Sequence, residues 1–241
     1  MKRTERHHLK ENELHVWARR AVDAFEAHRR ETAWTLAAVV IVGTIALGIV
    51  VWRQSGSNRA QALLADAMTV TNARIGAPIA PGTPGADLSF PTESERAKAA
   101  LAKFKAIAEA YPATDTGIFA RYQEAALQMT LGNPTAAVSA YQQVVDRAGT
   151  GVYGQMARLG LAEAQSRMGR YDQAIATFKD LAQLKDGPLP VDGILLQLGR
   201  TYRDAGKAAD AQQTFNRLVE EYPDSPFNEE AKRELDALKK T

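Results

Sequence analysis

The chain has 241 residues, of which 45% are hydrophobic and 24% charged, proportions typical of a folded protein. It contains no cysteine, which excludes disulfides, a thiol nucleophile and cysteine-based metal sites. The net charge of +2 comes entirely from residues 1–31, because residues 53–241 carry 22 basic and 22 acidic residues. This balance argues against nucleic acid as a partner.

Residues 1–31 are predicted to form a cytoplasmic amphipathic segment, helical from about Lys10 to Arg30. Its apolar residues recur at steps of three and four among charged ones: Leu14, Trp17, Ala21 and Phe25. One interpretation is a helix lying on anionic lipid, and the other is a docking helix for a membrane protein. All four histidines fall in this segment, without the i, i+4 spacing that would indicate a metal site.

Residues 32–52 contain no ionisable side chain, which predicts a transmembrane helix. A helix of this length reaches roughly 31 Å, the thickness of a bilayer's hydrocarbon core. Four residues are predicted to anchor it at the two membrane interfaces: Trp34, Trp52, Arg30 and Arg53.

The basic residues that flank this span predict its orientation. Four arginines lie in the 20 residues before it, whereas only Arg53 and Arg59 lie in the 20 after it. The N-terminus is therefore expected in the cytoplasm, and the C-terminal domain on the far side. A cleavable signal peptide is the alternative, but the apolar run is longer than such peptides use and no Ala-x-Ala pattern follows it. The span is expected to stay attached.

Residues 53–74 are predicted to continue as a helix, mainly from Ser57 to Arg74. Residues 75–93 are predicted to be a loop, because residues 76–91 hold four prolines and three glycines. Residues 94–241 are predicted to form a domain of helical repeats.

That domain repeats every 37 residues in four columns of the sequence. An alanine is followed four residues later by an aromatic residue and three further on by an aliphatic one. A glycine that can end a helix with a positive φ precedes three of the alanines by five residues. The columns are Ala100, Ala137, Ala174 and Ala211; Phe104, Tyr141, Phe178 and Phe215; Ile107, Val144, Leu181 and Leu218; and Gly132, Gly169 and Gly206. Such register is typical of stacked supersecondary units.

These columns resemble the tetratricopeptide repeat, whose pattern is W-x2-L-G-x2-Y, then A-x3-F, then P. The last unit matches it, except at the tryptophan, through Leu195, Leu198, Gly199, Tyr202, Ala211, Phe215 and Pro223. The resemblance implies an all-α chain, in which the single transmembrane helix precedes an α-solenoid of helical hairpins. A final capping helix is expected to begin with Ser225 as N-cap and Pro226 at its first position.

The order of parts is similar to the YfgM-type ancillary subunits of the bacterial Sec translocon. That resemblance implies an inner-membrane protein whose periplasmic repeats bind translocon subunits, exported chains or periplasmic chaperones. A scaffold for another envelope assembly, such as cell division or outer-membrane biogenesis, is the alternative. The expected partners are therefore proteins and the lipid bilayer, with no small-molecule substrate and no cofactor.

In the tetratricopeptide repeat the first helices of successive units line a groove. Projecting the family's groove positions onto this sequence selects Tyr122, Met129, Glu163, Arg167, Arg200 and Arg203. The hypothesis is that the apolar end near Tyr122 grips a side chain, while Arg200 and Arg203 hold carbonyls or a carboxylate. Catalysis is not expected, because residues 53–241 contain no histidine, no cysteine and no phosphate-binding or hydrolase motif.

Overall fold

The computed structural model describes residues 19, 29–76, 88–184 and 187–239. Side chains 29–33, 35–36 and 49–55 also lie outside the description. Most of the predicted cytoplasmic segment, including its four histidines, and most of the predicted Pro/Gly loop therefore lie outside the described residues. The chain divides into two compact units, residues 1–55 and residues 56–241.

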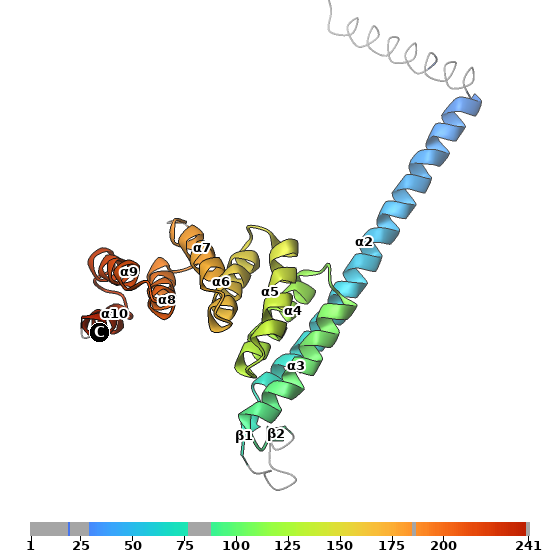
Figure 1. The fold of residues 1–241 in the computed structure, drawn as a ribbon. Coiled ribbons are helices and arrows are strands. Elements are labelled where there is room, and N and C mark those ends of the chain that lie inside the picture. The colour runs from blue at the N-terminus through green and yellow to red at the C-terminus, as the bar shows by residue number, and fades with distance from the viewer. Residues whose placement is uncertain (1–18, 20–28, 77–87, 185–186, 240–241) are drawn as a thin grey trace, which may run out of the picture. The chain divides into compact units, whose positions relative to one another are not determined.

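The described elements are almost all α-helices (Figure 1). In chain order they are α2 (Arg29–Thr71), β1 (Arg74–Ile75), β2 (Ser89–Phe90), α3 (Glu93–Ala110), α4 (Asp115–Thr130), α5 (Pro134–Ala148), α6 (Val152–Arg167), α7 (Tyr171–Ala182), α8 (Val191–Asp204), α9 (Ala208–Glu221) and α10 (Asn228–Leu238).

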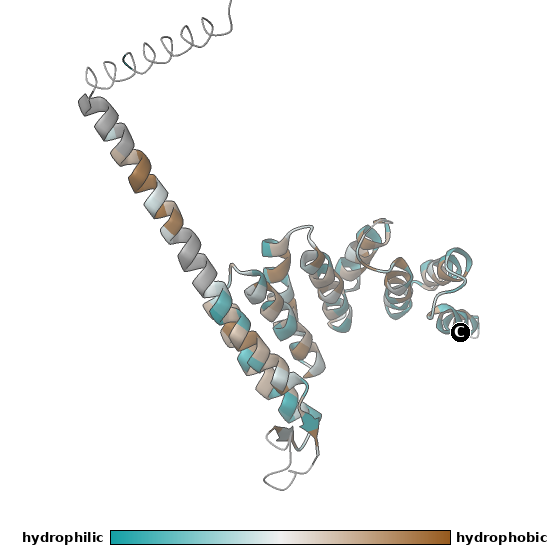
Figure 2. Ribbon diagram, turned by 180° about the vertical axis from the view of Figure 1, so that it is seen from behind, coloured by the Kyte–Doolittle hydropathy of each residue, from teal (hydrophilic) through white to brown (hydrophobic). Residues whose placement is uncertain are grey.

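Helix α2 runs without interruption through the apolar residues and on into residues 56–71 of the second unit. Its apolar side chains between Val39 and Leu47 are 57–68% exposed, and Trp34 is 77% exposed. Figure 2 shows brown, hydrophobic stretches along this part of α2. Among the residues that the structure describes, no helix combines the length and the apolar character of a candidate membrane span.

The second unit is a solenoid in which each helix packs on the next along the chain, from α3 to α10. Residues 56–71 of α2 pair with α3, and the pairs α4–α5, α6–α7 and α8–α9 follow. The predicted columns are confirmed: the four alanines are at most 1% exposed, the four aromatic residues at most 4% and the four aliphatic residues at most 3%. The φ angles of Gly132, Gly169 and Gly206 are +76°, +73° and +73°, as the sequence predicted for the turns between paired helices.

Two aromatic rings of these columns lie against glycines of a neighbouring helix. A Cβ added at Gly199 would lie 2.4 Å from the ring of Phe215, and one at Gly160 would lie 2.4 Å from the ring of Tyr141. No side chain fits at such a distance, so the aromatic ring occupies the volume that a side chain on α8 or α6 would take. Gly199, the glycine of the repeat pattern in the last unit, is thus required for helix packing rather than for a turn.

A pair of two-residue strands, which the sequence did not predict, brackets the Pro/Gly segment. β1 and β2 pair in parallel, Arg74 with Ser89 and Ile75 with Phe90. The guanidinium of Arg96 donates to the carbonyl of Ala73 at 3.2 Å, and Phe90 packs against the core shared by α2, α3 and α4. These contacts bring the two ends of the segment together beside α3.

The predicted start of the capping helix is wrong by about two residues. α10 begins at Asn228, not at Pro226, and Phe227 occupies the N-cap position without a side-chain cap. The hydroxyl of Ser225 instead donates to Asp192 Oδ2 at 2.6 Å and accepts from the Phe227 N–H at 3.1 Å. A contact across one repeat therefore replaces the local capping bond that the sequence suggested.

Candidate functional site

The first helices of successive units, α4, α6 and α8, contact each other directly in addition to their paired helices. Between α6 and α8, the hydroxyls of Ser166 and Thr201 are hydrogen-bonded at 3.2 Å. We call the surface of these three helices the first-helix face. The six residues predicted to form a groove lie on it: Tyr122 and Met129 on α4, Glu163 and Arg167 on α6, and Arg200 and Arg203 on α8.

At the α4–α6 part of this face, an aromatic pair lies beside a carboxylate. The rings of Tyr122 and Tyr141 have centroids 5.7 Å apart at 59°. Gly160 leaves room for the Tyr141 ring, and Glu163 follows three residues later on the same face of α6. Sequence reasoning missed Tyr141, because its position in the aromatic column marks it as core. The residue is indeed buried, and its ring lies beside that of Tyr122, one of the predicted groove residues.

Electrostatic coupling joins these side chains. Burial raises the pKa of Glu163, and the positive charge of Arg167 only partly offsets that effect. The pKa of Tyr122 is raised by burial and by the negative charge of Glu163. Burial, followed by Tyr122 and Glu163, raises the pKa of Tyr141 well above its usual range. Both tyrosines are therefore neutral hydroxyls at physiological pH, near the partly buried carboxylate of Glu163.

At the α8 end of the face, both predicted arginines are paired with carboxylates of α10. Arg200 forms ion pairs with Glu230 and, at 3.3 Å from its Nε, with Glu234. Arg203 Nη1 lies 2.5 Å from Glu234, and the same guanidinium also binds Asp204 at 2.9 Å. The prediction that these arginines hold a ligand carboxylate stays a prediction, and such a ligand would have to replace the chain's own carboxylates.

Glu230 and Glu234 were not selected from the sequence, although a signal for them exists. They follow Arg200 by 30 and 34 residues, close to the repeat length, and other contacts between units show similar separations. Lys103 pairs with Asp66 at a separation of 37, and Lys207 with Asp172 at 35. Opposite charges about one repeat apart are thus a sequence signal for contacts between neighbouring units.

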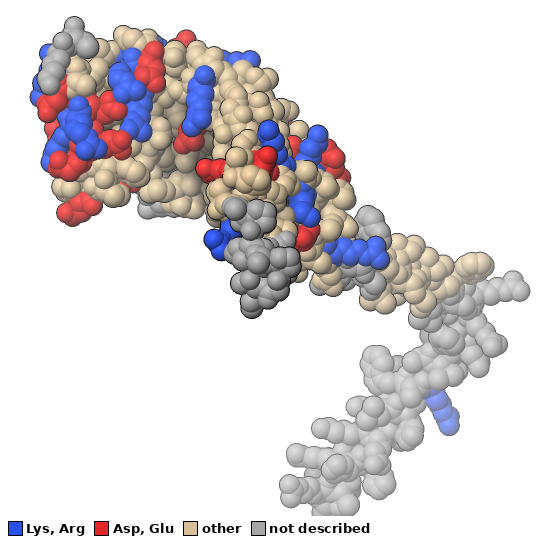
Figure 3. Space-filling model, turned by 90° about the horizontal axis from the view of Figure 1, so that it is seen from below, with Lys and Arg blue, Asp and Glu red and all other residues tan. Residues whose placement is uncertain are grey.

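The predicted membrane anchors are described only in part. Trp34 is exposed on α2, whereas the side chains of Trp52, Arg30 and Arg53 lie outside the described residues. Figure 3 shows basic and acidic side chains interleaved on one face of the molecule, without a large area of a single sign. That distribution fits the equal numbers of basic and acidic residues in positions 53–241.

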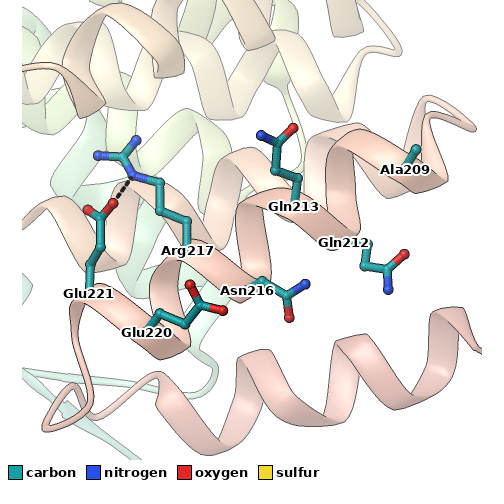
Figure 4. Close-up of a pocket in the computed structure, with 7 residues that line it drawn as sticks. All are labelled: Ala209, Gln212, Gln213, Asn216, Arg217, Glu220 and Glu221. Carbon is teal, nitrogen blue, oxygen red and sulfur yellow. Dashed lines mark hydrogen bonds and ion pairs between the residues drawn. The ribbon is translucent and has the colours of Figure 1, made fainter.

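A shallow depression of about 520 Å³ lies along α9, away from the first-helix face (Figure 4). All seven residues around it belong to α9, and most are polar: Ala209, Gln212, Gln213, Asn216, Arg217, Glu220 and Glu221. Arg217 and Glu221 pair with each other at 3.0 Å. A surface formed by one helix, with its charges already paired, has the character of a solvated face rather than a binding site.

Stacked antiparallel helix pairs with these buried columns define an α-solenoid of the tetratricopeptide-repeat class. The model of the tetratricopeptide repeat-like domain family matches residues 28–186, and a tetratricopeptide repeat model matches residues 194–225. Because the first match covers well over half of the chain, the protein belongs to the tetratricopeptide repeat-like domain family. No curated protein matches the chain.

A solved structure with a TM-score above 0.5 shares this fold, and two others have lower scores. The nearly identical TPR-like repeats of a predicted kinesin light chain from Podosopora anserina superpose with a TM-score of 0.54 at 14% identity, covering 61% of this chain and 78% of that one. A tetratricopeptide repeat protein from Parabacteroides merdae gives a TM-score of 0.49 at 15% sequence identity. The match covers 61% of this chain and 55% of that protein. YrrB, a TPR protein with an unusual peptide-binding site, gives a TM-score of 0.41 at 15% sequence identity. The match covers 58% of this chain and 84% of YrrB.

Proposed function

We propose that this protein is a membrane-anchored scaffold of the bacterial inner membrane that binds other proteins through its first-helix face. Tetratricopeptide repeats are typically interaction scaffolds without catalytic activity, and the family match carries that coarser part of the function. What we propose beyond the family is the membrane anchor, the location at the bacterial inner membrane and the identity of the protein partners. The observation that carries the anchor is the uninterrupted helix α2, which joins the uncharged segment to the first repeat unit.

Four features support residues 32–52 as the membrane span. They contain no ionisable side chain, and the segment lies inside a helix of 43 residues. The described apolar side chains of this segment are exposed, which is costly in water and favourable in lipid. The family match begins at residue 28, so the segment belongs to the matched domain and is not an addition to it.

The excess of arginines before the span supports an N-terminus in the cytoplasm and a repeat domain in the periplasm. Together with the order of parts, this topology supports an ancillary role at the Sec translocon or in the chaperone network around it. The repeat domain would then meet exported chains, translocon subunits or periplasmic chaperones as they emerge at the membrane.

The test is site-specific photo-crosslinking in membranes of the native host. A photoreactive amino acid replaces Tyr122, Glu163 or a residue of the span, and one at Gln213 on α9 serves as the control. We expect adducts to translocon subunits and exporting chains from positions 122 and 163, with none from 213. Adducts to a different envelope complex would replace the Sec role with the alternative scaffold. Release of the protein from membranes by alkaline carbonate would contradict the anchor itself.

A further inference from the structure

The carboxylate of Glu163, on the first-helix face, has no direct partner of opposite charge among the described residues. Among the described residues, Glu163 makes no hydrogen bond and no ion pair, and the positive charge of Arg167 acts on it without a direct contact. Its side chain is partly buried on α6, and this burial raises the pKa of the carboxyl group. Carboxylates that lose part of their hydration are usually compensated by a positive charge or a hydrogen bond within the chain, whereas this one has neither in direct contact. Sites that break such local rules are frequently binding sites.

The equivalent position in the next unit shows what a partner for this site looks like. Arg200 follows Glu163 by 37 residues, one repeat, and meets two carboxylates that α10 presents, Glu230 and Glu234. One repeat before those carboxylates, α8 presents Gly193 and Gln197, neither of which is charged. The chain thus supplies an opposite charge at the last unit and supplies none at α6.

The surroundings of Glu163 suit a basic side chain. The Tyr122 ring lies beside the Tyr141 ring at 5.7 Å, and both tyrosines are close enough to Glu163 for its charge to raise their pKa values. Aromatic faces attract ammonium and guanidinium groups and also contact their aliphatic stems. Met129, about two turns further along α4, adds an adaptable apolar surface.

From this charge complementarity we propose that the α4–α6 part of the first-helix face binds an extended segment of a partner protein through a lysine or arginine side chain. Glu163 accepts hydrogen bonds from the basic group, and Tyr122 contacts its stem. Arg167 is exposed and solvated, so it has no comparable need of a partner and weakens the attraction slightly. This inference rests on the proposed function, because it names the chemistry that the scaffold recognises.

The experiment is a selection from a library of random heptapeptides, with the full-length protein in detergent as bait. The baits are the wild type, Glu163→Gln and Glu229→Gln. The last variant removes an exposed carboxylate on α10 that pairs with Lys232. We expect the wild type and the Glu229→Gln control to enrich lysine or arginine at one fixed position. The Glu163→Gln bait should lose that enrichment.

One enriched peptide is then measured by fluorescence anisotropy. Replacing its basic residue by glutamine should weaken binding about tenfold or more, since charge-assisted hydrogen bonds contribute that much. The same loss should follow from Glu163→Gln, whereas Arg167→Ala should leave binding equal or tighter. Weaker binding by Arg167→Ala would overturn the assignment, because Arg167 would then hold the ligand.

Three outcomes of the selection contradict the inference. Peptides enriched without a fixed basic residue, or a basic residue still enriched by Glu163→Gln, overturn it and leave the proposed scaffold function standing. No enrichment by any bait overturns it as well, and also counts against peptide binding by this face. Crosslinks from positions 122 and 163 in native membranes remain the separate test of the scaffold function.

Discussion

Two parts of the first-helix face occupy the same place in the repeat but differ in how their charges are compensated. Arg200 on α8 is compensated by Glu230 and Glu234 of α10. Glu163 on α6, one repeat earlier, has no such partner among the described residues. The position in the repeat therefore decides where a side chain lies, whereas the next helix along the chain decides whether its charge is paired. The unpaired position is the one open to a partner protein.

The largest effect is expected from the packing that both parts share. Gly160→Ala or Gly199→Ala places a Cβ 2.4 Å from the ring of Tyr141 or Phe215, so the helices must move apart. We expect a net loss of about 2 kcal/mol in the free energy of unfolding, because overpacking outweighs the better helix propensity of alanine. Urea denaturation of the full chain in detergent measures it.

Gly56→Ala is the matched control for these variants, because no atom lies within 4 Å of a Cβ at that helical position. It should leave stability unchanged or raise it by up to about 1 kcal/mol. Combining Gly199→Ala with Phe215→Leu should recover part of the loss. If Gly199→Ala were as stable as Gly56→Ala, the Phe215 ring would not occupy the space next to Gly199.

The next effect concerns the paired end of the face. Glu234→Gln removes the carboxylate that binds both Arg200 and Arg203, and this side chain is only 14% exposed. Because the two arginines are 31% and 38% exposed, we expect a loss of about 1–2 kcal/mol, between the values for surface and buried pairs. Limited proteolysis should also release α10 sooner. Glu229→Gln, whose pair with Lys232 is exposed, should change neither, and equal losses from the two variants would contradict the assignment.

A smaller effect is expected at the junction between the two parts. Thr201 is 2% exposed; its hydroxyl bonds Gln197 O at 2.8 Å and the Ser166 hydroxyl of α6 at 3.2 Å. Thr201→Val keeps the shape and removes both bonds, so stability should fall by about 1 kcal/mol. In a double-mutant cycle with Ser166→Ala, a coupling of zero would show that the bond between α6 and α8 contributes nothing.

The sequence predicted the buried columns of the repeat well, but it did not predict the ion pairs between neighbouring units. The 37-residue period located the buried alanines, the aromatic rings and the positive-φ glycines, because each depends on packing that is repeated in every unit. The start of α10 was predicted wrongly, since Ser225 bonds Asp192 of the preceding unit rather than capping its own helix. The pairing of Arg200 was missed for the same reason: it depends on which residue the next unit presents, and a pattern within one unit carries no such information.

The smallest change in stability is expected from substitution of Glu163, the carboxylate without a partner. Unlike the other substitutions, this one should stabilise the protein. Burial raises the folded-state pKa of Glu163, so the folded protein favours the protonated form relative to the unfolded chain. The protein is therefore most stable with respect to this group below the ordinary carboxyl pKa, and it loses that stability as the pH rises through the raised pKa. Glu163→Gln, which is neutral at every pH, should be more stable than the wild type by roughly 0.5 kcal/mol at pH 7.

Urea denaturation at pH 4 and pH 7 measures this difference for Glu163→Gln and for the control Glu229→Gln. The advantage of Glu163→Gln should grow between the two pH values. The control should show no growing advantage, because Lys232 lowers the pKa of the exposed Glu229 instead of raising it. A wild type that is more stable than Glu163→Gln at pH 7 would mean that the carboxylate already has a favourable partner within the chain. Its role would then match that of the Arg200 pairs, and the contrast between the two parts of the face would disappear.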